Sequence, residues 1–440
     1  MGDMNPLAKQ LNDIIQAGNP HILDMLSDIG KKVFFPKGIL SQSAEAKQKA
    51  HKINATIGIA TEEGDIMAMP SVAKAINDIT AAESLTYAPS FGILELRKKW
   101  QDEQKEKNPS MADAFISLPV VTCGITHAVS IAADIWIDPG DVVILPDKMW
   151  GNYNMIMGVR KGAVIKNYTL FTETGGFNLE AFEAKLNEEA SANGKLVVLL
   201  NFPQNPTGYT VTKDEGEQIA TVLKKIADKG TNLIVMADDA YFGLFYEEDT
   251  MKESIFAKLA NAHERIIAVK LDGATKENFV WGLRVGFITY STKINGEEGP
   301  FYDALERKTA GAIRGNISNA SHLGQSIILK SMNDKNYETE KTAKFNILKK
   351  RANRVKDVVY DEKYKSYWDV YPFNSGYFMC IRLKDLDAET VRLHLLDTYG
   401  VGLIALGDKD LRVAFSCIEE SDVTELFEII KQGIDDLRKG

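Results

Sequence analysis

Residues 196–208 read Leu-Val-Val-Leu-Leu-Asn-Phe-Pro-Gln-Asn-Pro-Thr-Gly, an apolar run that passes directly into a turn with two prolines and a glycine. Short runs of Val, Ile and Leu without polar alternation are typical of strands that are buried on both faces of a sheet. Such runs occur at Leu118–Cys123, Val142–Leu145, Leu196–Phe202, Leu233–Ala237, Ile266–Leu271 and Val285–Tyr290. Amphipathic helical patterns such as Asp214–Lys229 lie between them. This order predicts an α/β fold with a mainly parallel sheet.

The 440 residues are enough for two domains, because single cores stop growing at roughly 250–300 residues. We expect residues 1–60 to form an N-terminal arm and part of a small domain, and residues 61–325 to form a large domain. Residues 326–440 would complete the small domain. There, Gly376–Leu383 has the pattern of a strand and Ser421–Leu437 that of an amphipathic helix, which predicts a smaller α+β layer.

Charge and cysteine usage narrow the class of protein. The net charge is -9, and Lys and Arg are interspersed with Asp and Glu, which disfavours nucleic acid as a partner. The cysteines, Cys123, Cys380 and Cys417, are widely spaced and form no C-x-x-C pattern, so we expect reduced thiols and no metal site. We see no secretory signal and no run of about 18 apolar residues. We therefore expect a soluble cytoplasmic protein with no membrane partner.

Ligands of open parallel sheets bind at the carboxyl ends of the strands, so the residues that follow the apolar runs are candidates for a site. After the first run, Gly124, Ile125 and Thr126 open a helix, and a helix N-terminus beside a hydroxyl can bind an anion. Trp150 follows the second run and has a flat face that can stack on a heteroaromatic ring. An ordinary strand-to-helix turn and a packed core tryptophan are the alternatives.

The third and fourth runs end in polar groups of a different kind. Asn205 is held in the proline turn with its amide free to donate a hydrogen bond. The fourth run ends in Asp238-Asp239-Ala240-Tyr241, but no His or further carboxylate stands at metal-ligand spacing. Asp238 could instead face a pyridine nitrogen and keep it protonated. Tyr241, three positions later, could reach the same ligand.

The fifth run leads to Thr275 and Lys276. An amine in a desolvated pocket loses its proton readily, which makes Lys276 a candidate for Schiff-base formation. Arg284 follows eight residues later and could clamp a phosphate with its planar fork. The alternative is a solvated surface lysine, and the position just past a buried strand argues against it.

These residues, in this order, resemble those of the fold-type I pyridoxal-5'-phosphate enzymes of aminotransferase class I/II, in particular the aspartate and aromatic aminotransferases. The resemblance runs from about residue 55 to the C-terminus and rests on Asn205-Pro-Thr-Gly, Asp238-x-Ala-Tyr241 and the Lys276–Arg284 pair. It implies a seven-stranded, mainly parallel sheet between helices, with pyridoxal phosphate bound to Lys276. It also implies ping-pong transamination between an L-amino acid and a 2-oxo acid such as 2-oxoglutarate, with Lys276 moving the proton.

The resemblance assigns a cofactor contact to each residue singled out above. Gly124, Ile125, Thr126 and Arg284 would bind the phosphate, and Trp150 would stack on the ring face. Asn205 and Tyr241 would hydrogen-bond the phenolic oxygen, and Asp238 would bind the ring nitrogen. The chain departs from the family at Gly273, where a hydroxyl residue often stands three positions before the lysine. We expect Thr275 to supply that hydroxyl.

The resemblance also implies how substrate is bound. Arg412 resembles the arginine that grips the α-carboxylate, and Gly58 resembles the glycine of a substrate-lining loop. Tyr87 resembles a tyrosine that crosses a dimer interface to a neighbour's phosphate. Arg314 resembles a partner-subunit arginine that binds the side-chain carboxylate of aspartate, glutamate or 2-oxoglutarate; a solvated helix-end arginine is the alternative. We therefore expect a homodimer with shared active sites and a preference for aspartate or aromatic amino acids.

Two other functions stay open at this point. A pyridoxal-phosphate lyase or decarboxylase would share every cofactor residue. A regulator that kept the fold and lost catalysis would carry a DNA-binding segment in front of it, but residues 1–60 contain no dense basic run and Lys276 is retained.

Overall fold

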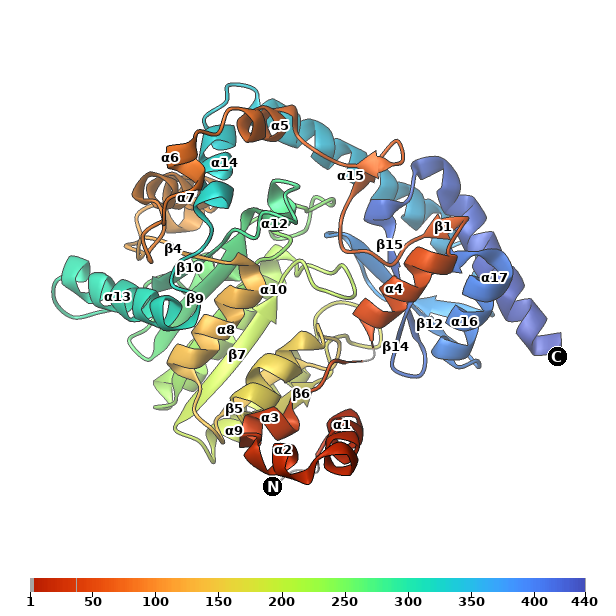
Figure 1. Ribbon diagram of the computed structural model, residues 1–440, viewed down its shortest axis with the longest axis horizontal. Coiled ribbons are helices and arrows are strands. Elements are labelled where there is room, and N and C mark those ends of the chain that lie inside the picture. Colours follow the sequence, from red (N-terminus) through yellow and green to blue (C-terminus); the bar gives the residue numbers. More distant parts are fainter. Residues whose placement is uncertain (1–3, 37, 440) are drawn as a thin grey trace.

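The computed structural model describes residues 4–36 and 38–439, and its largest element is a seven-stranded sheet (Figure 1). In spatial order the strands are β4 (Val120–Thr122), β10 (Gly286–Ser291), β9 (Ile266–Gly273), β8 (Asn232–Asp238), β7 (Lys195–Asn201), β5 (Val142–Pro146) and β6 (Val164–Tyr168). β10 is antiparallel to both of its neighbours, and the other pairs are parallel. The predicted α/β fold with a mainly parallel sheet is confirmed.

The central strands are apolar because both faces of the sheet are covered. Along β7, Val197 and Leu199 belong to one apolar cluster, whereas Val198 and Leu200 belong to another. Successive side chains of a strand point to opposite faces, so the two clusters are the two sides of the sheet. Each predicted apolar run coincides with one of the strands to within two residues at either end. The edge strand β6 was not predicted, because only its last residue, Tyr168, is buried.

Helices cover both faces of this sheet. On one face α8 (Gly124–Trp136) packs on β9 and β10, and α13 (Glu298–Asn316) packs on α8. The helices of the other face are α9 (Leu179–Ala190), α10 (Lys213–Asp228) and α11 (Ile255–Leu259). α7 (Leu94–Lys107) stacks Trp100 on Phe287 of β10, with ring centroids 4.2 Å apart. The predicted helix Asp214–Lys229 corresponds to α10 within one residue.

A smaller α+β domain lies beside the large sheet (Figure 1, blue). Its antiparallel sheet has the order β11 (Trp368–Val370), β12 (Phe378–Leu383), β15 (Asp410–Ala414) and β14 (Ile404–Leu406). Its helices are α15 (Tyr337–Val359), α16 (Ala388–Tyr399) and α17 (Val423–Lys439). The predicted strand and terminal helix correspond to β12 and α17 within two residues.

Residues from near the N-terminus join this domain. α4 (Ile39–Lys49) packs on β13 (Val401–Gly402) and β14, and β1 (Ile53–Asn54) pairs with β13 in parallel. The preceding helices lie apart from α4, at the lower edge of Figure 1; they are α1 (Pro6–Gly18), α2 (Pro20–Met25) and α3 (Asp28–Lys32). The exact domain boundaries stay a prediction.

The remaining elements are short or lie between those already named. They are β2 (Thr61–Glu62), β3 (Asp65–Ile66), α5 (Pro70–Asn77), α6 (Ala81–Ser84), α12 (Ala274–Glu277) and α14 (His322–Met332), with short helical turns at Pro109–Met111, Glu362–Tyr364, Phe415–Cys417 and Glu420–Asp422 and a π-helical segment at Asn154–Arg160. α14 packs on α5, α6 and α7. Within residues 4–36 and 38–439, no helix is both long enough and apolar enough to cross a membrane.

Candidate active site

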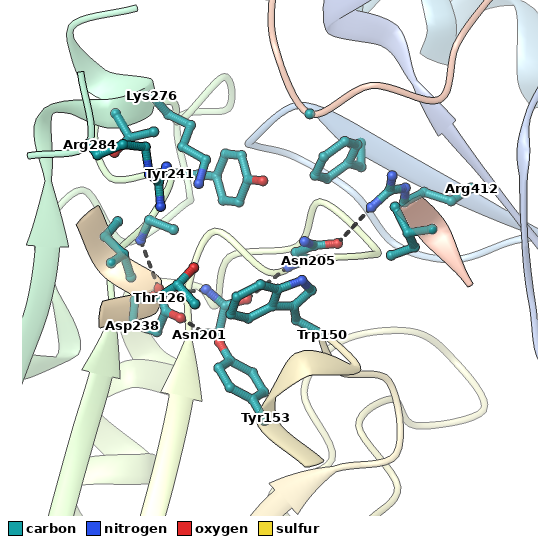
Figure 2. Close-up of a pocket in the computed structure, with 16 residues that line it drawn as sticks. Thr126, Trp150, Tyr153, Asn201, Asn205, Asp238, Tyr241, Lys276, Arg284 and Arg412 are labelled. Atoms are coloured by element: carbon teal, nitrogen blue, oxygen red, sulfur yellow. Dashed lines mark hydrogen bonds between the residues drawn. The ribbon is translucent and has the colours of Figure 1, made fainter. Parts of the chain in front are cut away.

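A cavity of about 190 Å³ lies where β8 and β9 end, between the large sheet and the small domain (Figure 2). Eleven of the predicted site residues line it, namely Gly58, Ile125, Thr126, Trp150, Asn205, Asp238, Tyr241, Thr275, Lys276, Arg284 and Arg412. The cavity therefore brings together side chains that are spread over most of the sequence. Within the part of the chain that the structure describes, no cluster of His, Cys, Asp and Glu side chains is arranged to hold a metal ion.

Lys276 extends into the cavity from α12, directly after β9. Its ammonium nitrogen lies 4.9 Å from the centre of the Tyr241 ring. Burial is the main cause that lowers the pKa of Lys276 to about 8; Asp238 opposes this shift, and Arg284 contributes to it. The ordinary pKa of a lysine is about 10.4, so near neutral pH a far larger fraction of Lys276 than of a solvated lysine is the neutral, nucleophilic amine.

Asp238 ends β8 and is almost completely buried. Its carboxylate accepts hydrogen bonds from the Tyr153 hydroxyl at 2.5 Å and from the Ala240 backbone N–H at 3.1 Å. Burial raises the pKa of Asp238, and the hydrogen bond from Tyr153 opposes that rise. A buried carboxylate with this few donors is suited to bind a protonated ring nitrogen.

The opening of α8 is shaped as a cradle for an anion. Gly124 has φ +77°, and a Cβ there would lie 2.6 Å from Nη2 of Arg284, so only glycine fits. The Arg284 guanidinium donates one long hydrogen bond, 3.4 Å to the Trp281 carbonyl, and keeps further donors for a ligand. The Thr275 hydroxyl is buried and has no hydrogen-bond partner among the described residues. These unsatisfied donors beside a helix N-terminus fit the phosphate of pyridoxal phosphate.

The departure at Gly273 has a steric cause. A Cβ at this position would lie 2.7 Å from the Val285 carbonyl oxygen and 2.9 Å from Cα of Gly286. A serine or threonine therefore does not fit between β9 and β10. Thr275 lines the cavity two residues later, as expected from the sequence.

Arg412 faces Lys276 from the opposite side of the cavity (Figure 2). It lies on β15, is 2% exposed, and its guanidinium carbon sits 4.1 Å from the centre of the Phe378 ring. Its two terminal nitrogens donate to Asn205 Oδ1 at 3.2 Å and to the Thr56 carbonyl at 2.9 Å. Its Nε has no partner among the described residues. A buried guanidinium with spare donors is suited to bind a carboxylate.

Three predicted residues are not among those that line the cavity of their own chain: Gly124, which lies beside it against Arg284, Tyr87 and Arg314. Tyr87 is 89% exposed, and Arg314 lies in the last turn of α13, where it donates to the Ser318 hydroxyl at 2.7 Å. Both were expected to act on a second copy of the chain, so their positions in one chain are compatible with that role.

Five lining residues were not predicted from the sequence: Ile39, Tyr153, Asn201, Ala240 and Phe378. Asn201 donates to the Asp238 carbonyl at 2.8 Å and accepts from the Asn205 N–H at 2.9 Å, so it ties two functional segments together. Asn201 directly follows the apolar residues 196–200, and this position could have identified it as a site residue. Ile39 and Phe378 carry no such signal, because only the folded chain brings them to the cavity.

Comparison with known proteins agrees with this geometry. The model of the family "Aminotransferase class I and II" matches residues 50–430. A probable N-acetyl-LL-diaminopimelate aminotransferase of Bacillus subtilis is 26% identical over 79% of this chain and 82% of its own length. An aspartate aminotransferase of Pinus pinaster is 30% identical over 53% of this chain but only 44% of its own length.

A solved aminotransferase structure from Anaerococcus prevotii superposes with a TM-score of 0.82. The superposition covers 93% of this chain and 98% of that one at 24% identity, and it supports the fold alone. The family match covers most of the sequence and includes every predicted site residue. The chain belongs to aminotransferase class I and II and is a pyridoxal-phosphate-dependent enzyme.

Proposed function

We propose that this enzyme moves an amino group between an L-amino acid and a 2-oxo acid through Lys276, in two half-reactions that share one cavity. The observation that carries the assignment of residues is the arrangement of Lys276 and Arg412. Lys276, whose pKa is lowered, and Arg412, which is buried and has a spare donor, lie on opposite sides of a cavity of about 190 Å³. A cavity of this size suits a small molecule with an α-carboxylate at one end and a reacting carbon at the other.

In this proposal the chain holds pyridoxal phosphate by its charged and polar ends. Arg284, Thr275 and the N-terminus of α8 would hold the phosphate, and Asp238 would hold the ring nitrogen. The bound cofactor supplies an aldehyde carbon and a ring that accepts electrons. Tyr241 and Asn205 would hydrogen-bond the phenolic oxygen, and Trp150 would cover a ring face.

The protein's own residues then carry out binding and proton transfer. Arg412 fixes the α-carboxylate, which orients the Cα–H bond toward Lys276. Neutral Lys276 would accept the Cα proton as general base and would then return a proton, as general acid, to the carbon that comes from the cofactor's aldehyde. Trp150, Phe378 and Ile39 give the cavity apolar walls that exclude water from this transfer.

For the substrate side chain we propose a carboxylate, with an aromatic ring as the second class. The first class is supported by the names of two relatives, the probable N-acetyl-LL-diaminopimelate aminotransferase and the aspartate aminotransferase, and by the place of Arg314. The second is favoured by the apolar walls of the cavity, among them Phe378 and Trp150.

We infer that the enzyme is a cytoplasmic homodimer. Leu85 and Tyr87 are more than four-fifths exposed and follow one another closely in one segment, which suits a surface that a second copy covers. In such a dimer Tyr87 and Arg314 would reach the neighbour's cavity. The cysteines are unpaired, as suits a reducing compartment.

The test is an absorbance spectrum of the purified protein with pyridoxal phosphate, repeated after addition of L-aspartate without any oxo acid. We expect the visible band to give way to a near-ultraviolet band, and 2-oxoglutarate to restore it. A visible band that aspartate leaves unchanged would remove the carboxylate proposal, and a panel of aromatic amino acids would follow. Lack of any visible band would contradict the role of Lys276.

A further inference from the structure

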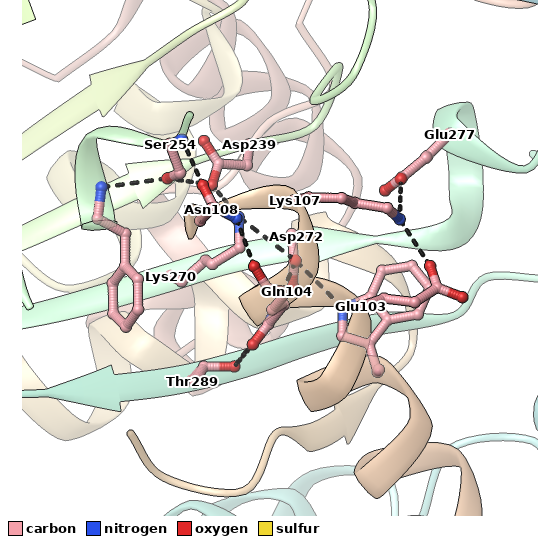
Figure 3. A network of polar contacts seen from close by, with 12 residues as sticks. Glu103, Gln104, Lys107, Asn108, Asp239, Ser254, Lys270, Asp272, Glu277 and Thr289 are labelled. Atoms are coloured by element: carbon pink, nitrogen blue, oxygen red, sulfur yellow. Dashed lines mark hydrogen bonds and ion pairs between the residues drawn. The ribbon is translucent and has the colours of Figure 1, made fainter. Parts of the chain in front are cut away.

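On the side of the sheet that α7 covers lies a largely buried set of charged and polar side chains that the proposed reaction does not use (Figure 3). We call it the α7 network. Its members are Glu103, Gln104, Lys107, Asn108, Asp239, Ser254, Lys270, Asp272, Glu277 and Thr289. Buried charges are costly unless they are paired, so a network of this size calls for a physical reason.

The network holds the two acids that directly follow the two central residues of the site. Asp239 follows Asp238, and Glu277 follows Lys276. Both acids are at least nine-tenths buried, and neither lines the cavity. Asp238 and Lys276 thus face the cavity, while the next residue in sequence faces the network in each case.

One half of the network anchors the end of β8. The Asp239 carboxylate is paired with Lys270, which is 1% exposed, and accepts from the Ser254 hydroxyl at 2.6 Å. Lys270 also lies 3.5 Å from Asp272, whose carboxylate accepts from the Gln104 amide at 3.1 Å. Through Gln104 this half reaches α7.

The other half anchors the turn that carries Lys276. The Glu277 carboxylate lies 2.6 Å from the nitrogens of both Lys107 and Lys341. Lys107 belongs to α7 and also pairs with Glu103 at 2.6 Å, as Figure 3 shows. Lys341 belongs to α15, the helix that continues into the small domain.

A second contact between the turn and α15 makes the attachment rigid. Asn278 donates to the Tyr337 hydroxyl at 2.9 Å. Tyr337 and Lys341 are one helical turn apart, so one face of α15 binds two successive residues after Lys276. Since α12 has only four residues, its own backbone hydrogen bonds do little to fix it.

We propose that Glu277 is a positioning residue: bound by Lys107 and Lys341, it fixes the turn that carries Lys276 relative to the network that anchors Asp238. The inference rests on the proposed roles of Lys276 and Asp238. It explains why a carboxylate is buried with two lysines at this place. Loss of the anchor would let the Lys276 turn move and admit water, and small misplacements of a catalytic group are costly.

The main test uses the double variant Glu277→Gln/Lys341→Met, which removes one charge of each sign and leaves Lys107 paired with Glu103. The single variant Glu277→Gln leaves a buried lysine without its partner, so a failure of that variant to fold would not decide the question. The groups near the Lys276 nitrogen, Asp238, Arg284 and Tyr241, are not substituted in either variant. The matched control is Glu306→Gln, which removes a carboxylate paired at 2.7 Å with Arg97, also on α7.

Two readouts separate positioning from stability. The first is the rate at which the cofactor-free protein captures pyridoxal phosphate, followed through the visible band over a range of pH. In the double variant we expect the midpoint of this rate to move upward by at least about 0.5 pH units, because water entering the turn removes part of the desolvation that lowers the pKa of Lys276. The second is turnover, where we expect kcat to fall roughly 10- to 100-fold with KM changed much less.

The control is expected to lose thermal stability while keeping the wild-type midpoint and kcat. A folded double variant with the wild-type pH midpoint and kcat would overturn the proposal. A control variant whose pH midpoint and kcat change as much as those of the double variant would also overturn it. If the unaltered protein forms no visible band, the role of Lys276 fails and this inference fails with it.

Discussion

The two sides of the cavity differ in how they are built. The inner side, at the ends of β8 and β9, consists of groups such as Asp238 and Thr275 that are buried and fixed within one chain. The outer side depends on Ile39 from α4 and, in our proposal, on Arg314 of a second copy. The identity of the cofactor can therefore be inferred from the residues of a single chain. The choice of substrate side chain depends in addition on surfaces that a single chain leaves exposed.

The inner side is tested most directly by Lys276→Ala. We expect turnover to fall by at least about 10⁴-fold, because the variant loses both the cofactor bond and the proton carrier. The fold should survive, since alanine adds no buried charge. Turnover assays together with circular dichroism check both points, and a variant with normal turnover would refute the inner-side assignment.

Arg412→Lys probes the boundary between the two sides. Lysine keeps the charge but loses the planar fork, so we expect KM for the amino acid to rise roughly 10- to 100-fold with a smaller change in kcat. Steady-state kinetics of both variants checks this, with Arg438→Lys as the control, because Arg438 forms an ion pair with Asp385 at the surface. Equal effects of the two substitutions would rule out a special role for Arg412.

The outer side is tested by Arg314→Ala. We expect kcat/KM for aspartate to fall roughly tenfold or more, while kcat/KM for an aromatic amino acid stays nearly constant. Arg307→Ala is the matched control, because Arg307 lies on the same helix and is exposed beside Asp303. If Arg314→Ala lowers kcat/KM equally for aspartate and for the aromatic amino acid, Arg314 does not select the substrate side chain.

The smallest expected effect is the pH dependence of cofactor capture by the unaltered protein. Only the neutral amine reacts, and burial lowers the pKa of Lys276 to about 8. The rate should therefore rise about tenfold between pH 7 and its plateau above pH 8. A rate that keeps rising through pH 10 would mean that Lys276 is solvated, contrary to the cavity geometry.

The sequence predicted the sheet and the inner side well, because buried strands and the polar residues at their ends leave local patterns. Asp238, Lys276 and Arg284 all follow or adjoin such runs. Tyr153 was missed because its link to the site is a hydrogen bond to Asp238, 85 residues away in sequence. The edge strand β6 escaped because its exposed positions break the apolar pattern.

The same limit applies to the α7 network. Glu103 and Lys107 look like an ordinary exposed pair on a charged helix, and the sequence gives no sign that Glu277 joins them or that Lys341 pairs with Glu277. Such contacts depend on packing between α7, α12 and α15, which short sequence patterns do not encode.

The position of Ile39 affects how variants of this enzyme should be sought. This residue lines the cavity, yet it lies before residue 50, where the family match begins. A library that diversifies only the matched segment would leave one wall of the substrate space unchanged. Mutagenesis at Ile39, on a helix that packs away from the seven-stranded sheet, would let substrate preference be redesigned while the chemistry at Lys276 is left alone.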